Sequence, residues 1–371
     1  MSQDSKLFTP TTVGGMALPH RLVMAPMTRA RSSQPGDIPN SMNAAYYAQR
    51  ASASFIISEA SQISPQGKGY SFTPGIYSPE QVAGWRLITD AVHKEGGRIF
   101  VQLWHVGRMS HPEFHQGELP VAPSAVPFDA SIWKVNATTG VGEMVACVTP
   151  RALETAEIKG IVEDFRMAAR NAMAAGFDGV EIHGANGYLI DQFLRTTSNL
   201  RTDEYGGSRE NRLRFLQEVV NAVVDEIGAE RTAIRLAPFL TARGMACPDI
   251  LPTMLDAAKF LQAKGIAYLH LVEADWDDAP VFTEEFRQQI RARFTGPIIV
   301  AGNYDITRAN RVLEQGYADL VAFGRPFVAN PDLPRRLAEG LPLADFDGAS
   351  LYGGTATGYV DYPAWTASAQ A

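Results

Sequence analysis

A histidine, an asparagine and a tyrosine lie close together in the run HGANGY, which begins at His183 and ends at Tyr188. If the chain makes a helical turn here, His183 and Asn186 share one face and can direct two donors at one oxygen. Removing one such donor from a developing oxyanion typically costs ~2.7–4 kcal/mol. Tyr188 is a candidate proton donor beside that oxygen, because a phenol keeps its proton at neutral pH. The alternative is that His183 is a structural core histidine and Tyr188 only packs.

Two glycines late in the chain predict a phosphate site. Gly302 follows the apolar run 298–301, and Gly324 follows the run 320–323 and precedes Arg325. In parallel α/β barrels the loops after the seventh and eighth strands often bind phosphate through backbone N–H groups. The guanidinium fork of Arg325 suits a phosphate. Each glycine alone could be an ordinary turn residue, whereas the pair favours a phosphate site.

The elements that must position these residues are short apolar runs alternating with amphipathic segments. The expected strands are Leu22–Met27, Phe55–Ala60, Ile99–Trp104, Val180–His183, Ala233–Ala237, Tyr268–Val272, Ile298–Ala301 and Leu320–Phe323. The expected helices are Asn43–Ala53, Pro79–Glu95, Ala156–Ala175, Arg209–Ile227, Leu251–Ala263, Thr283–Phe294, Thr307–Gln315 and Leu333–Glu339. Such near-continuous apolar strands are typical of parallel sheets that are buried on both faces. Eight alternations predict a closed (β/α)8 barrel, and the rival doubly wound sheet lacks its Gly-rich fingerprint after the first strand.

A barrel of this kind carries its active site at the C-terminal ends of the strands. Polar and aromatic residues lie in or just after the C-terminal parts of six of the expected strands, at Ala25–Arg29, Gln102–His105, His183–Tyr188, Arg235, Gly302–Asn303 and Gly324–Arg325. We therefore expect these residues to converge on one mouth.

Three segments fall outside the repeat. Residues 8–19 read as a hairpin that plugs the barrel floor. Residues 110–150 form a long segment rich in Pro, Gly, Ser and Thr, which we interpret as a cap over the mouth. The segment from Leu341 onward is expected to fold back over the same mouth. We expect one domain over residues 1–371.

Composition excludes several function classes. Lys and Arg number 33 against 40 Asp and Glu, so the net charge of −7 argues against a nucleic-acid partner. No apolar stretch approaches the ~18 residues of a membrane span, and a cytoplasmic location is expected. The only cysteines, Cys147 and Cys247, cannot form a disulfide framework. His105, His111 and His115 match no zinc spacing, so no metal site is predicted.

The motifs resemble those of the old yellow enzyme family of flavin-dependent ene-reductases, in particular its bacterial members. The matching stretches span nearly the whole chain: APMTR at 25–29, QLWHVGR at 102–108, HGANGYLIDQFL at 183–194, RTDEYGGSRENR at 201–212, FGRPFVANPDL at 323–333 and GYVDYP at 358–363. Thr28 places the chain with the subgroup that carries Thr, rather than Cys, at that position. The cap matches less well, and Trp133, Phe239 and Trp276 have no assigned role.

The resemblance implies non-covalent FMN at the mouth of a TIM barrel. The residues that would contact the flavin ring are Pro26, Thr28 (bonding O4), Ala60, Gln102 (at the pyrimidine edge) and Arg235 (near N1). The residues that would cradle the phosphate are Gly302, Asn303, Gly324 and Arg325. His183 and Asn186 would hold the substrate carbonyl, and Tyr188 would protonate the α-carbon. Tyr70, Trp104 and Tyr352 would shape the substrate pocket.

The resemblance also implies a ping-pong reaction in which NADPH or NADH reduces the flavin, which then passes hydride from N5 to the β-carbon of an α,β-unsaturated carbonyl compound. Nitrate esters or quinones are alternative substrates of the same site. Two other classes stay open. One is a non-redox phosphate-binding barrel, such as an isomerase or aldolase, with Glu181 or Glu273 as base. The other is a flavoprotein that binds or senses with slow turnover. The partners expected are small molecules, and the chain is a monomer or a homodimer.

Overall fold

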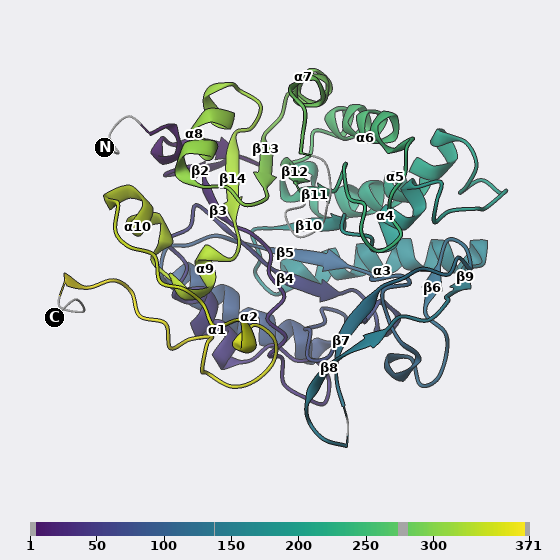
Figure 1. The fold of residues 1–371 in the computed structure, drawn as a ribbon, viewed down its shortest axis with the longest axis horizontal. Helices are drawn as coiled ribbons and strands as arrows, with labels where there is room; N and C mark the ends of the chain where they lie inside the picture. Colours follow the sequence, from purple (N-terminus) through teal and green to yellow (C-terminus); the bar gives the residue numbers. More distant parts are fainter. Residues whose placement is uncertain (1–4, 137, 274–280, 368–371) are drawn as a thin grey trace.

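Eight parallel strands close into a barrel in the computed structural model, which describes residues 5–136, 138–273 and 281–367. The neighbouring strands run in the order β3 (Leu22–Met24), β4 (Ile56–Gln62), β5 (Ile99–Trp104), β10 (Gly179–Gly184), β11 (Thr232–Leu236), β12 (Tyr268–Val272), β13 (Ile298–Ala301) and β14 (Leu320–Phe323). β14 pairs with β3 and completes the ring. The predicted (β/α)8 fold is confirmed (Figure 1).

Helices surround the barrel (Figure 1). They are α1 (Ser41–Ala48), α2 (Pro79–Lys94), α3 (Thr155–Ala174), α4 (Leu189–Leu194), α5 (Arg209–Ile227), α6 (Ile250–Lys264), α7 (Glu284–Arg293), α8 (Ile306–Glu314), α9 (Pro326–Ala329) and α10 (Leu333–Glu339). None of the helices in the described ranges is both long enough and apolar enough to cross a membrane.

Two predicted elements differ most from the structure in their bounds, for local reasons. The first strand ends at Met24 rather than Met27, because Pro26 has no N–H to continue the ladder. The first helix spans Ser41–Ala48 rather than residues 43–53. Its start is fixed by Asn40, whose side chain accepts hydrogen bonds from the backbone N–H groups of Met42 and Asn43.

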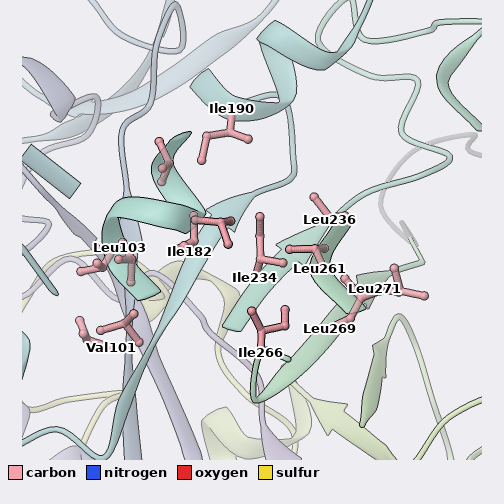
Figure 2. Close-up of a cluster of buried hydrophobic side chains, with 14 of the residues drawn as sticks. Val101, Leu103, Ile182, Ile190, Ile234, Leu236, Leu261, Ile266, Leu269 and Leu271 are labelled. Atoms are coloured by element: carbon pink, nitrogen blue, oxygen red, sulfur yellow. The ribbon is translucent and has the colours of Figure 1, made fainter. Parts of the chain in front are cut away.

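The apolar core has two layers, because alternate residues of each strand face opposite sides of the sheet. The outer layer lies between strands and helices. Figure 2 shows part of it, with Ile182 of β10 and Ile234 of β11 near Leu261 of α6. This layer anchors the strands, so their inward-facing residues are held in fixed positions.

The inner apolar layer closes the N-terminal end of the barrel. The strands β1 (Thr11–Val13) and β2 (Met16–Leu18) form an antiparallel hairpin. Its residues Val13 and Leu18 pack in one buried cluster with Phe55, Phe100 and Tyr268 of the barrel strands. The hairpin therefore plugs the barrel floor, as the sequence predicts.

The long segment between β5 and α3 contains four short strands. β6 (Val121–Ala122) pairs with β9 (Arg151–Ala152), and β7 (Ser131–Val135) pairs antiparallel with β8 (Gly142–Ala146). Trp133 of β7 lies 6.0 Å from the ring of Tyr352 in the C-terminal segment. The β7–β8 hairpin and the C-terminal segment therefore meet at Tyr352, which the sequence predicts to shape the substrate pocket.

Candidate active site

The inward positions of β5 and β12 change from apolar to polar toward the C-terminal end of the barrel. Phe100 and Tyr268 belong to the apolar layer above the hairpin. Two residues further along the same strands, Gln102 and His270 are buried polar residues. Since side chains two apart share a face, a polar floor lies directly above the apolar one.

A cavity of about 380 Å³ opens at this end, within the range of small-molecule and cofactor sites. Eight of the predicted site residues line it: Pro26, Asn186, Arg235, Gly302, Asn303, Gly324, Arg325 and Tyr352. They come from the ends of five strands and from the C-terminal segment. The structure thus brings the four predicted phosphate residues, two predicted flavin-ring residues and two predicted substrate residues into one cavity.

Four predicted residues form a second group built around Tyr188. The Tyr188 ring lies 4.8 Å from the rings of both His183 and Trp104. Its hydroxyl lies 3.2 Å from the Tyr70 hydroxyl. Ala60 belongs to the same buried cluster. This arrangement places a phenol edge-on to an imidazole, and neither ring is among the lining residues of the cavity.

The helical turn expected from His183 to Asn186 is wrong. His183 still belongs to β10, and Asn186 adopts a left-handed conformation with φ of 58°. Helix α4 begins only at Leu189. Gly187, with φ of 78°, continues the left-handed turn. Glycine adopts this conformation readily because it has no Cβ, whereas most other residues do not.

The electrostatic setting of His183 favours a neutral ring. Burial and the nearby charge of Arg235 hold the pKa of His183 well below its usual value. Its Nδ1 accepts a hydrogen bond from the Ala185 N–H at 3.3 Å. The proton of the neutral ring therefore sits on Nε2, which leaves a neutral donor at that atom.

Two predicted flavin residues, Thr28 and Gln102, are not among the lining residues of the cavity. Thr28 is half-buried next to Met27. Gln102 is buried, and its Nε2 donates to Glu181 Oε1 at 2.7 Å. Glu181 in turn pairs with His270.

Sequence reasoning missed Arg243, in the loop after β11. Its guanidinium lies 5.6 Å from the centre of the Tyr188 ring, and its Nη1 donates to the Asn186 carbonyl at 2.9 Å. The signal in the sequence is its position, shortly after a strand end. Phe239, which also had no assigned role, packs 5.1 Å from Phe282. Trp276 lies outside the described residues.

Two buried arginines hold the C-terminal segment over the mouth. Arg29 donates to the carbonyls of Leu351 and Gly358 at 3.0 and 2.8 Å, and Arg31 donates to that of Ser350 at 2.8 Å. Tyr359 stacks on Tyr46 of α1 with ring centres 4.1 Å apart. Figure 1 shows this segment running beside α1. These contacts fix Tyr352 at the edge of the cavity.

The histidines that follow β5 have local partners. His105 Nδ1 accepts from the Gly107 N–H at 3.1 Å, and burial lowers the pKa of His105 to about 3. His115 Nε2 lies 2.8 Å from the Ser110 hydroxyl. Within the described parts of the chain, no group of three or more His, Cys, Asp or Glu residues could hold a metal ion.

Residues 6–344 match the NADH:flavin oxidoreductase / NADH oxidase family. 12-Oxophytodienoate reductase 1 of Oryza sativa subsp. japonica is 46% identical over 370 residues, covering 96% of this chain and 92% of the relative. Morphinone reductase has a TM-score of 0.94 at 49% identity, covering 98% of this chain and 97% of its own. The old yellow enzyme homologue from Zymomonas mobilis has a TM-score of 0.91 at 42% identity, covering 97% and 100%. The chain belongs to the old yellow enzyme family.

As a member of the old yellow enzyme family, the chain is an NAD(P)H-dependent flavin oxidoreductase of the general ene-reductase type, and FMN is its cofactor. A nicotinamide nucleotide is the hydride donor, and morphinone reductase has been solved in complex with tetrahydroNAD. The family membership predicted from the motifs is confirmed.

The cavity fits the cofactor of the old yellow enzyme family. A Cβ added at Gly324 would lie 3.5 Å from Met27 Sδ and 3.8 Å from the Ala25 Cβ, and both residues line the cavity. Glycine thus keeps open a space that a side chain would narrow. Arg235 and Arg325 line the same cavity and offer positive charge to an anionic group.

The two candidate bases of the non-redox alternative, Glu181 and Glu273, both have partners in the structure. Glu181 is paired with His270 at 2.8 Å, and Glu273 is paired with Arg287 at 2.8 Å and with Arg308 at 2.6 Å. Each carboxylate is therefore committed to neighbouring side chains, and the old yellow enzyme assignment makes the chain a redox enzyme.

Proposed function

We propose that the chain reduces the C=C bond of α,β-unsaturated carbonyl compounds, with His183 and Asn186 binding the carbonyl oxygen and Tyr188 protonating the α-carbon. The observation that supports this most directly is the Tyr188 ring, which lies 4.8 Å from the His183 imidazole. FMN held in the cavity would supply the hydride, with NADPH or NADH as its source. The names of three relatives or neighbours, 12-oxophytodienoate reductase, morphinone reductase and chanoclavine-I aldehyde reductase, all describe carbonyl compounds.

The side chains suit these roles chemically. A neutral His183 Nε2–H can donate to an oxygen that gains negative charge. Asn186 lines the cavity, and its buried Oδ1 has no hydrogen-bond partner among the described residues. A buried acceptor without a partner is unfavourable, and a donor on a bound molecule would satisfy it. The substrate carbonyl oxygen would instead accept from the Asn186 Nδ2–H.

The remaining assignments follow the resemblance. Pro26, Thr28, Ala60, Gln102 and Arg235 would bind the flavin ring, and Gly302, Asn303, Gly324 and Arg325 would bind its phosphate. Tyr70, Trp104 and Tyr352 would shape the substrate space. A single domain over residues 1–371 with a cap at 110–150, a cytoplasmic location and a monomeric or homodimeric state stay predictions.

The direct test is the visible spectrum of the purified protein, followed by steady-state NADPH and NADH oxidation with 2-cyclohexenone. We expect a yellow protein whose nicotinamide oxidation depends on the enone under anaerobic conditions. Flavin without enone-dependent turnover would instead support a binding or sensing role. Nitrate esters and quinones in the same assay test the alternative substrates.

Removing both proposed carbonyl donors should weaken the binding of phenols, whose oxygen would occupy the same position. We expect His183→Ala combined with Asn186→Ala to raise the Kd of a phenol at least about tenfold, because each lost hydrogen bond contributes on the order of 1 kcal/mol or more. Titration followed by the flavin absorbance measures this Kd.

The matched control for this double variant is His20→Ala, which removes a histidine that precedes β3 at the opposite end of the barrel. It should leave the phenol Kd unchanged. Equal phenol affinity in the double variant and the wild type would contradict the assignment of the two donors.

A further inference from the structure

A carboxylate that the proposed reaction does not use lies inside the barrel. Glu181 of β10 is fully buried, and its two oxygens face two different strands. Oε1 accepts from Gln102 Nε2 of β5 at 2.7 Å, and Oε2 lies 2.8 Å from His270 Nδ1 of β12. A buried charge is unfavourable unless it is paired and hydrogen-bonded, so both contacts are needed to retain it.

The barrel register explains how Glu181 reaches both partners. Glu181 lies directly opposite Gln102 on one side and Ala233 of β11 on the other. Ala233 has only a methyl group, so the Glu181 side chain can extend past β11 to His270. His270 is itself the register partner of Arg235, which lines the cavity. The carboxylate therefore sits beside the polar floor of the site.

The charge states in this cluster fix which way the Gln102 amide is turned. Burial acts to raise the pKa of Glu181, but His270, Arg235 and Gln102 outweigh it and hold the pKa below its usual value. Burial lowers the pKa of His270, so its ring is neutral and donates through Nδ1. An ionised carboxylate only accepts hydrogen bonds. The nitrogen of Gln102 must therefore face Glu181, and its oxygen must point away.

We propose that Glu181 is a positioning residue that turns the Gln102 amide so that its oxygen accepts from the N3–H of the flavin pyrimidine ring. This inference rests on the proposed contact between Gln102 and that edge of FMN. The uncharged edge of the ring offers one N–H between two carbonyls, so an amide that could turn freely would present the wrong group half of the time. Glu181 removes that freedom before FMN binds.

The test compares FMN with 3-methyl-FMN, which cannot donate from N3. Flavin is removed from the full-length protein, and both Kd values are measured by quenching of flavin fluorescence. We expect the wild type to bind FMN about ten- to a hundredfold more tightly than the analogue, because the analogue leaves a buried acceptor unsatisfied. In Glu181→Gln the new amide can both donate and accept, so the Gln102 amide can turn, and the ratio of the two Kd values should fall below about threefold.

Two further variants keep the result interpretable. Glu59→Gln neutralises another buried acid, on β4, whose carboxylate accepts from the Arg29 and Ala30 N–H groups, and it should keep the wild-type ratio. Gln102→Met removes the amide and should abolish the preference even if Glu181→Gln fails to fold.

Each possible result has a defined meaning. A wild-type ratio in a folded Glu181→Gln protein, or in Gln102→Met, would overturn the proposal, and so would equal binding of both flavins by the wild type. Failure of the wild type to bind either flavin would contradict the proposed function instead. A merely structural role of Glu181 predicts weaker binding of both flavins at a constant ratio.

Discussion

Replacing Tyr188 by Phe is expected to slow enone reduction by roughly 10²–10⁴-fold, the usual contribution of a positioned general acid. The same change should leave reduction of the flavin by NADPH nearly intact, because that half-reaction requires no proton at the α-carbon. The ring contacts with His183 and Trp104 do not involve the hydroxyl, so the phenyl ring can keep its place. Anaerobic stopped-flow absorbance of the flavin measures the two half-reactions separately.

The control for this variant is Tyr70→Phe, which removes the hydroxyl 3.2 Å from that of Tyr188. We expect it to slow enone reduction less than about tenfold, because it deletes one neutral hydrogen bond to the donor. An equal loss in both half-reactions of Tyr188→Phe would show that the hydroxyl is not the proton donor.

The second large effect is expected from Gly302→Ala, at the end of β13. The added Cβ would overlap the backbone carbonyl of Glu273, and Gly302 has φ of 139°, which L side chains rarely adopt. Overpacking against backbone typically costs about 1–3 kcal/mol, and relief requires the loop that carries Asn303 to move. We therefore expect at least about tenfold weaker FMN binding and a lower Tm. Equilibrium titration with FMN and thermal unfolding measure the two effects.

Gly316→Ala separates the clash from the backbone conformation. Gly316 also has a positive φ, of 72°, but a Cβ there would meet nothing within 4 Å. This variant should lose some stability and keep the FMN affinity of the wild type. FMN affinities that are equal in the two variants would rule out Gly302 as part of the phosphate cradle.

The barrel could be predicted because each strand reads as a continuous apolar run and each helix has its own periodicity. The strand ends then located the polar residues that line the cavity, since parallel strands present their C-terminal ends together. The predicted element boundaries were wrong where a single residue determines the end or the start of the element. Pro26 ends β3 early, and Asn40 starts α1 ahead of the amphipathic pattern.

The inward-facing polar network could not be predicted in the same way. Glu181, His270 and Gln102 lie on three strands that are far apart in the sequence, and their pairing depends on barrel register. From the sequence, Glu181 could be a catalytic base in a strand, whereas in the structure its carboxylate contacts Gln102 and His270. The turn at Asn186 was also missed, because the left-handed conformation depends on its surroundings rather than on spacing.

The arrangement of Arg29 and Arg31 has a consequence for biosynthesis. Both arginines donate to carbonyl groups that lie more than 300 residues later in the chain. These carbonyls belong to the residues just before Tyr352, which lines the cavity. A nascent polypeptide that has emerged from the ribosome only as far as α10 has all eight barrel strands but an incomplete pocket. Flavin captured during translation would therefore be held loosely until residues 350–358 arrive, and shortened proteins lacking them should lose the coenzyme on dialysis while staying folded.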